Sequence, residues 1–323
     1  FIVSREQNYQ LELRSGICCV EDSDASDINS LLDRANMALK TIKVKGAAQW
    51  KFYDHTMRDK LLREKDLEIR MEKALADGEF LVYIQPKYWV GTRALAGGEA
   101  LVRWKSPDQG FLSPGEFIPL FEKNRFIVKL DQFMFTSVCG LLRQWLDAGI
   151  EPRPLSVNVS RMQFHTPDFV ERYIRIKSQY AIPDGLLELE FTESIFFDNV
   201  ALLSSAVHEL RRAGIKCSID DFGAGYSSLN VLKALPVSVL KLDGMFFRTA
   251  KDDEQAKIVI RNIMRMAGEL KMATVAEGVE THEQVAFLET TGCDIIQGYV
   301  FARPMPAAEF TELLAGEGGH AER

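Results

Sequence analysis

The chain has 323 residues, of which 46% are hydrophobic and 26% charged, and its formal net charge is −7. These values are typical of a soluble globular protein with one large or two smaller domains. The acidic balance argues against a basic surface for nucleic acid polymers, and no apolar run reaches the ~18 residues that cross a bilayer. We expect a cytoplasmic segment that makes no membrane contact itself. Whether the full-length protein has a membrane anchor upstream is left open.

The five cysteines and five histidines are dispersed along the chain and contain no CxxC pair or metal-ligand spacing. Free thiols in a reducing compartment therefore fit better than a disulfide framework or a zinc site.

The first segment, "LRSGICCVEDSDASDINSLLDRANMALKTIKVKGAAQWKFYD" at residues 13–54, resembles the C-terminal third of a GGDEF (diguanylate cyclase) domain. The resemblance implies a small α+β fragment over residues 1–55, in which two strands flank a helix at 27–46. Asn36 and Lys40 replace the acid and the aromatic residue of the family's "AD-x-ALY-x-AK-x-x-G" pattern. The GGDEF signature loop is not in this chain, so we expect no cyclase activity from it.

The next segment, "TMRDKLLREKDLEIRMEKALADG" at residues 56–78, has the charge pattern of an exposed amphipathic helix. It either links the fragment to the following domain or serves as the first helix of that domain.

From residue 79 onward, short apolar stretches that end in a polar residue alternate with amphipathic segments of helical length. Eight such strands are predicted, at residues 80–86, 94–104, 154–160, 186–194, 215–223, 237–243, 272–280 and 293–299. Ala213-Gly214 and Gly292 lie where helix C-caps are expected.

This alternation predicts a (β/α)8 TIM-type barrel over residues 79–316, followed by a tail at 317–323. An open doubly wound sheet is the alternative, but its GxGxxG turn is missing after the first strand. Only a short linker joins the first two strands, whereas a parallel crossover needs a dozen or more residues. We therefore expect one antiparallel strand in the barrel.

Polar residues occupy one face of several strands and oppose apolar residues on the other face. In "LELEF", for example, Glu190 opposes Leu189 and Phe191, and the apolar face must meet the helices. The polar side chains should therefore meet at the carboxyl end of the barrel, where barrel enzymes keep their chemistry. They are Glu99, Asn158, Glu190, Asp220, Asp221, Lys241, Glu277 and Gln297.

So many carboxylates in one place repel one another, and Lys241 offers too little positive charge. Oxygen-only ligands favour hard cations such as Mg²⁺, Mn²⁺ or Ca²⁺. Five carboxylates favour two ions, and a pair about 3.5–4 Å apart suits phosphoryl displacement.

Eight ordered motifs between residues 73 and 316 resemble the EAL domain, the cyclic-di-GMP phosphodiesterase family. They are "QP" (85–86), "GGEALVRW" with Glu99-Ala100-Leu101, "NVS" (158–160), "LEFTES" (189–194), "DDFGAGYSS" (220–228), "LKLD" (240–243), "AEGVE" (276–280) and "QGY" (297–299).

The resemblance implies a role for each matching residue. Glu99, Asn158, Glu190 and Asp220 match the ligands of one metal ion, and Asp220, Asp221 and Glu277 match those of a second. Lys241, Glu277, Glu99 and Gln297 are the expected catalytic residues, and Gln85, Leu101, Arg103 and Asp243 the expected substrate contacts. Glu280 is expected to support the ligands, and Glu193 to anchor the loop after Asp221.

The implied reaction is hydrolysis of cyclic-di-GMP to linear 5′-pGpG with two divalent cations, Mg²⁺ or Mn²⁺, and Ca²⁺ is a candidate inhibitor. The resemblance also implies a homodimer through the barrel. The alternatives are a catalytically silent cyclic-di-GMP receptor and a phosphodiesterase for another dinucleotide.

Overall fold

The computed structural model describes residues 2–4, 7–9, 13–20, 27–42, 49–192, 195, 200–223, 236–249 and 253–318. The chain divides into two compact units, Phe1–Glu72 and Lys73–Arg323. Within the described residues, no helix is both long enough and apolar enough to cross a membrane.

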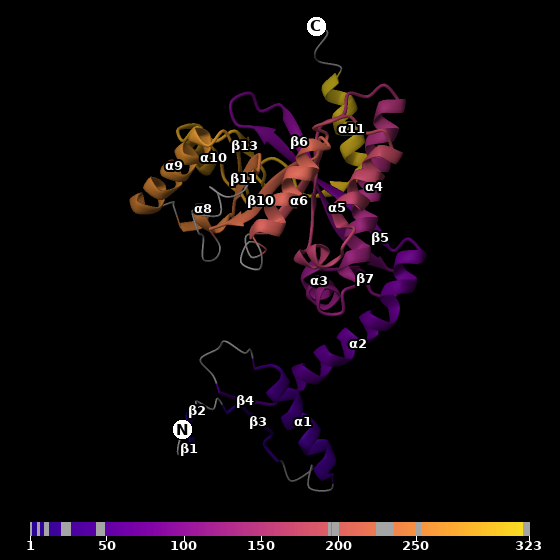
Figure 1. The fold of residues 1–323 in the computed structure, drawn as a ribbon, viewed down its shortest axis with the longest axis vertical. Helices are drawn as coiled ribbons and strands as arrows, with labels where there is room; N and C mark the ends of the chain where they lie inside the picture. The colour runs from indigo at the N-terminus through magenta and orange to yellow at the C-terminus, as the bar shows by residue number, and fades with distance from the viewer. Residues whose placement is uncertain are drawn as a thin grey trace. The chain divides into compact units, whose positions relative to one another are not determined.

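The first unit contains two small sheets, helix α1 and most of helix α2 (Figure 1). Strands β1 (Ile2–Ser4) and β2 (Gln7–Tyr9) form an antiparallel pair, whereas β3 (Ser15–Ile17) and β4 (Trp50–Phe52) pair in parallel. Helix α1 (Ile28–Lys40) connects the parallel pair, so two strands flank a helix as expected. Helix α2 (His55–Ala76) covers most of the segment for which a charged helix is predicted.

The second unit is built around a closed ring of eight strands. In the order of the ring they are β5 (Phe80–Trp89), β6 (Leu95–Ser106), β8 (Leu155–Asn158), β9 (Leu187–Thr192), β10 (Lys216–Phe222), β11 (Val239–Leu242), β12 (Ala273–Ala276) and β13 (Ile295–Ile296). The ring closes because β5 pairs with both β6 and β13. All eight predicted strands are present.

Strand β5 is antiparallel to both of its neighbours in the ring, and the other seven strands are parallel. Residues 90–94, which join β5 to β6, are too few for a crossover helix, so the chain turns back as a hairpin. The prediction of one reversed strand is confirmed. Two further strands were not predicted. Strand β7 (Gly110–Leu112) pairs with β6, and β14 (Met305–Pro306) pairs with β5.

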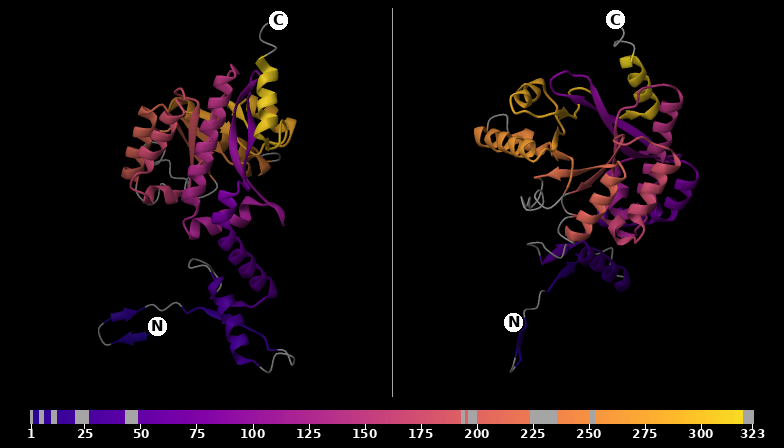
Figure 2. Two further views of the ribbon diagram at one scale, coloured as in Figure 1. Left: turned by 90° about the vertical axis from the view of Figure 1, so that its right-hand side faces the viewer. Right: turned by 45° about the horizontal axis from the view of Figure 1, so that its top comes forward.

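The helices of this unit lie outside the ring of strands (Figure 2). They are α3 (Pro114–Lys123), α4 (Ile127–Asp147), the 3-10 helix η2 (Arg161–His165), α5 (Phe169–Gln179), α6 (Val200–Arg212), α8 (Met245–Thr249), α9 (Glu254–Glu269), α10 (His282–Glu289) and α11 (Ala307–Gly318). Gly214 and Gly292 follow α6 and α10 with φ of 76° and 78°, a conformation that glycine adopts without steric penalty.

The hydrophobic core lies between the strands and these helices. Along β9 and β11 the fully buried Leu189, Phe191 and Leu240 belong to this core. Successive residues of a strand point to opposite faces, so Glu190 and Lys241 are directed into the barrel. Burial of each large apolar side chain stabilises the fold by roughly 1.5–3 kcal/mol, which helps to offset the burial of charges inside the ring.

Candidate active site

A cavity of about 410 Å³ lies where the parallel strands end. Its volume falls in the usual range of roughly 300–1,000 Å³ for small-molecule sites. It is lined by Gln85, Glu99, Leu101, Asn158, Asp220, Asp221, Asp243, Gly244, Met245, Glu277, Gly278 and Gln297. Most of the predicted site residues are therefore brought together, from strands far apart in the chain.

The ammonium group of Lys241 lies at the centre of the acidic residues. Its Nζ is 2.6 Å from Glu190 Oε2, 2.6 Å from Glu277 Oε1, 3.1 Å from Asp220 Oδ1 and 3.4 Å from Glu99 Oε2. The side chain is fully buried, so these contacts are shielded from water. One lysine thus links four carboxylates that come from β6, β9, β10 and the end of β12.

Two amides hold the carboxylate of Glu99 in place. Asn158 Nδ2 donates to Glu99 Oε1 at 2.7 Å, and Gln297 Nε2 donates to Glu99 Oε2 at 2.7 Å. Gln297 Nε2 also lies 3.1 Å from Gln85 Oε1. The orientation of Glu99 is therefore fixed from both sides of the cavity.

The adjacent acids Asp220 and Asp221 both reach the cavity, although alternation along a strand would separate them. The register between β10 and β11 shifts after Ile219, and Asp221 has φ of 53° in the left-handed region. This local distortion turns Asp221 toward its neighbour. Asp220, Asp221 and Glu277 each offer a carboxylate oxygen, and these atoms lie within 4.8 Å of one another.

The site holds more negative charge than its lysine neutralises. Burial and the Glu190 carboxylate raise the pKa of Glu99, and burial and the Asp220 carboxylate raise the pKa of Asp221 to about 6. Burial, followed by Asp220, raises the pKa of Glu277 well above its usual range despite the opposing effect of Lys241. Acids that resist ionisation in this way need additional positive charge to become carboxylates.

Glu190 behaves differently from the other acids. Burial alone would raise its pKa, but Lys241 and Lys87 outweigh that effect and lower the pKa of Glu190 to about 2. Conversely, burial would lower the pKa of Lys241, yet the surrounding carboxylates, Asp220 and Glu190 foremost, raise it well above its usual range. Glu190 is therefore a carboxylate and Lys241 an ammonium at neutral pH.

The donor set fits hard divalent cations. The clustered oxygens come from carboxylates and an amide, and the described lining includes neither cysteine nor histidine; its one sulfur is the thioether of Met245, a soft donor that hard cations do not favour. Mg²⁺, Mn²⁺ and Ca²⁺ prefer such ligands. Burial, followed by neighbouring carboxylates, raises the pKa values of Glu99, Asp221 and Glu277, and a bound cation would favour the ionised form of all three.

The structure adds a second buried cation that the sequence reasoning missed. Lys87 Nζ donates to Ser156 Oγ at 2.7 Å and to Glu190 Oε1 at 2.9 Å. Predicting a strand that ended at residue 86 left Lys87 outside it, although β5 continues and its alternation places Lys87 on the same face as Gln85. Glu188 is also buried, and its Oε1 has no hydrogen-bond partner among the described residues.

Glu190 and Lys241 are fully buried and do not line the cavity, although Lys241 contacts three acids that do. Three other predicted residues lie apart from the cavity or outside the described part of the chain. The Arg103 guanidinium lies 5.6 Å from the centre of the Tyr83 ring and is not part of the described cavity lining. Glu280 is exposed, and its backbone N–H donates to Gln284 Oε1 at 2.8 Å. Glu193 lies outside the described residues.

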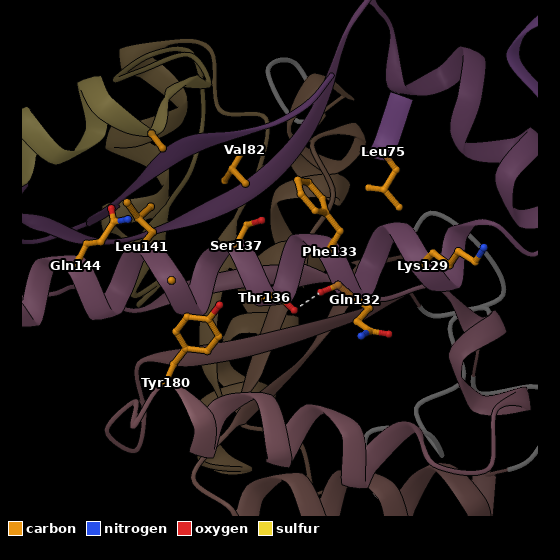
Figure 3. Close-up of a pocket in the computed structure, with 12 residues that line it drawn as sticks. Leu75, Val82, Lys129, Gln132, Phe133, Thr136, Ser137, Leu141, Gln144 and Tyr180 are labelled. Carbon is orange, nitrogen blue, oxygen red and sulfur yellow. Dashed lines mark hydrogen bonds between the residues drawn. The ribbon is translucent and has the colours of Figure 1, made fainter. Parts of the chain in front are cut away.

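A second hollow of about 710 Å³ lies against the outer face of α4 (Figure 3). It is lined by Leu75, Val82, Lys129, Gln132, Phe133, Thr136, Ser137, Gly140, Leu141, Gln144, Tyr180 and Ala307. None of these described lining residues is an acid or a histidine, so they offer no carboxylate or imidazole ligand for a metal ion.

The family model of the EAL domain matches residues 69–304, which include every strand of the ring. The bifunctional diguanylate cyclase/cyclic di-GMP phosphodiesterase MucR of Pseudomonas aeruginosa is 32% identical over 292 residues, which are 90% of this chain and 43% of that protein. The cyclic di-GMP phosphodiesterase NbdA of the same organism is 34% identical over 292 residues, which are 90% of this chain and 37% of that protein.

Among solved structures, the PaMucR phosphodiesterase in complex with c-di-GMP superposes with a TM-score of 0.72 at 35% identity, covering 76% of this chain and 99% of that one. The chain spans less than half the length of the curated relatives MucR and NbdA. The family match and this superposition both support the assignment of the barrel. The chain belongs to the EAL domain family.

Proposed function

We propose that the barrel hydrolyses cyclic-di-GMP to linear 5′-pGpG with two divalent cations, Mg²⁺ or Mn²⁺. The supporting observation is that Glu99, Asn158, Asp220, Asp221 and Glu277 line one cavity, and that the buried Lys241 joins Glu190 to Glu99, Asp220 and Glu277. The named relatives MucR and NbdA are cyclic-di-GMP phosphodiesterases, which supports the same substrate.

Glu99, Asn158, Glu190 and Asp220 would hold one cation, and Asp220, Asp221 and Glu277 the other. When bound, the cations supply the positive charge that neutralises these carboxylates and stabilises the charge developing on the phosphodiester.

The chain's own residues prepare the site for this displacement. Lys241, whose pKa the neighbouring carboxylates raise so that it stays an ammonium, would donate hydrogen bonds and offset negative charge on the reacting phosphate. Gln297 keeps Glu99 oriented through its 2.7 Å hydrogen bond. Gln85, Leu101 and Asp243 line the cavity and would contact the substrate. Arg103, on the same face of β6 as Leu101, is proposed as a substrate contact on the family resemblance alone.

The experiment is incubation of the chain with cyclic-di-GMP and Mn²⁺ or Mg²⁺, followed by chromatographic separation of products. We expect 5′-pGpG with either metal, none in EDTA, and none from the Glu99→Ala variant. Glu269→Ala, which removes an exposed acid paired with Arg265 on α9, is the matched control and should retain activity.

Tight binding of cyclic-di-GMP without turnover would instead identify a receptor and contradict the proposal. Preferential turnover of another cyclic dinucleotide in competition would correct the substrate.

We also propose that residues 1–55 are the C-terminal part of a GGDEF domain, 56–78 a linking helix, 79–316 the barrel and 317–323 a tail. Support comes from the parallel β3–α1–β4 unit and from the relation to the bifunctional MucR. A homodimer through the barrel is proposed on the family resemblance. Light scattering coupled to gel filtration tests it, and a monomeric mass at all concentrations would contradict it.

A further inference from the structure

Helix α4 buries one charged residue in an otherwise apolar stripe. The stripe faces the barrel and consists of Ile127, Leu130, Asp131, Met134, Phe135, Val138, Cys139, Leu142 and Trp145. Asp131 is only 6% exposed, and burial raises its pKa to about 7. A leucine would suit this position at a lower free-energy cost, because burying a carboxyl group is unfavourable. The presence of an acid at position 131 therefore indicates a specific role for its carboxyl group.

The carboxylate of Asp131 binds the segment that leaves strand β8. Its Oδ2 accepts the backbone N–H of Ser160 at 3.0 Å and the side-chain amide of Gln163 at 3.1 Å. The Gln163 Nε2 donates in addition to the backbone oxygen of Val128 on α4, at 3.1 Å. The exit from β8 is thus tied to α4 at two points.

Asn158 is the last residue of β8, two positions before the anchored Ser160. The N–H of Val159 bonds to Glu190 O at 3.0 Å, so the three-residue exit is held between β9 on one side and Asp131 on the other. Asn158 itself lines the cavity and donates to Glu99 Oε1. A shift of Ser160 would therefore move the amide that reaches the proposed cation.

We propose that Asp131 is a positioning residue that fixes Asn158 for cation binding by holding the backbone N–H of Ser160. The inference rests on the proposed function, because Asn158 is there a metal ligand. Asp131 does not touch the cavity, so it acts only through the backbone of residues 158–160.

A pair of substitutions at Ser160 isolates the hydrogen bond. Ser160 has φ of −66°, which proline adopts without strain, so Ser160→Pro removes the N–H without changing φ and places a ring carbon opposite Asp131 Oδ2 instead of the donor. Ser160→Ala removes the same hydroxyl group, including its bond to Glu122, but keeps the N–H. Comparing the two separates loss of the N–H from loss of the hydroxyl.

The assay is Mn²⁺ binding to the purified chain, followed by electron paramagnetic resonance. We expect Ser160→Pro and Asp131→Leu to weaken Mn²⁺ binding about tenfold, as loss of a ligand's supporting partner does elsewhere. Ser160→Ala and Asp131→Asn should stay within about twofold, since the amide oxygen of Asn still accepts the N–H. Neither Ser160→Pro nor Asp131→Leu should weaken binding further in an Asn158→Ala background.

A control from the same stripe distinguishes positioning from general destabilisation. Val138→Ala leaves a cavity in the core of α4 and should lower the melting temperature without changing Mn²⁺ affinity. The inference is overturned if Ser160→Pro binds Mn²⁺ as tightly as Ser160→Ala, if Val138→Ala weakens binding equally, or if the effects persist without Asn158. Failure of the unmodified chain to bind Mn²⁺ would overturn the proposed function, and the inference with it.

Discussion

Replacing Lys241 with methionine removes the positive charge from the centre of the site while keeping the length of the side chain. The ammonium group contacts four carboxylates, two of them at 2.6 Å, and is fully buried. Removing one partner of a buried ion pair typically destabilises a protein by about 3–5 kcal/mol. The raised pKa values of Glu99 and Glu277 allow these acids to take up protons, which keeps the loss within that range.

In a domain of this size such a loss lowers the melting temperature by roughly 6–20 °C. The loss should depend on metal, because divalent cations replace the missing charge. We therefore expect the Lys241→Met variant to gain several degrees more from saturating Mn²⁺ than the unmodified chain gains. Thermal unfolding in EDTA and in Mn²⁺, followed by circular dichroism, measures both quantities.

Lys177 provides the matched control. It is also a buried lysine, it contacts Asp184 and the backbone oxygen of Ala213, and it is no part of the cavity. Lys177→Met should lose stability equally in EDTA and in Mn²⁺. The reasoning is refuted if Lys241→Met is as stable as the unmodified chain in EDTA, or if Mn²⁺ stabilises both proteins to the same extent.

Three further predictions concern other parts of the barrel. Lys87→Met should destabilise the chain by about 3–5 kcal/mol in urea unfolding, because the fully buried Glu190 loses one of its two lysines; a change below about 1 kcal/mol would contradict this. Gly298→Ala should lower the free energy of unfolding by about 3 kcal/mol, and with it the melting temperature, because the added Cβ would lie 2.0 Å from Val279 O. An unchanged melting temperature would contradict this prediction. The pKa of Asp221, about 6 in the fold against an ordinary 3.8, means that its contribution to the stability of the metal-free chain is present at low pH and lost as pH rises through 6. Solvent screening limits this contribution to about 1 kcal/mol or less. The Asp221→Asn variant should therefore show a flatter dependence of unfolding free energy on pH between pH 4 and about 6. An unaltered pH dependence would contradict the prediction.

Much of the barrel could be predicted from the sequence because its strands carry a local signal. Each is a short apolar run with a polar end, and residues 90–94 are too few for a parallel crossover. The short strands β7 and β14 escaped prediction, since two or three residues show no periodicity. The first strand was predicted to end at Pro86, yet β5 continues to Trp89. Lys87 was therefore not recognised as a strand residue that faces the site.

The positions of the site residues at strand ends were also predictable, but their mutual contacts were not. Alternation would place Asp221 opposite Asp220, and only the register shift and the left-handed backbone bring them together. On β6, Arg103 shares a face with Glu99 and Leu101. It lies two residues beyond Leu101, however, and is outside the cavity lining. Such features depend on three-dimensional packing and leave no periodic trace in the chain.

The central claim is that the carboxyl end of the barrel holds two divalent cations. Titration of the metal-free chain with Mn²⁺, with free Mn²⁺ followed by electron paramagnetic resonance, counts them directly. We predict two bound ions per chain and a single tightly bound ion in the Asp221→Ala variant, which lacks one of the three oxygens clustered within 4.8 Å. A stoichiometry below two in the unmodified chain, or two ions in the variant, would contradict the account.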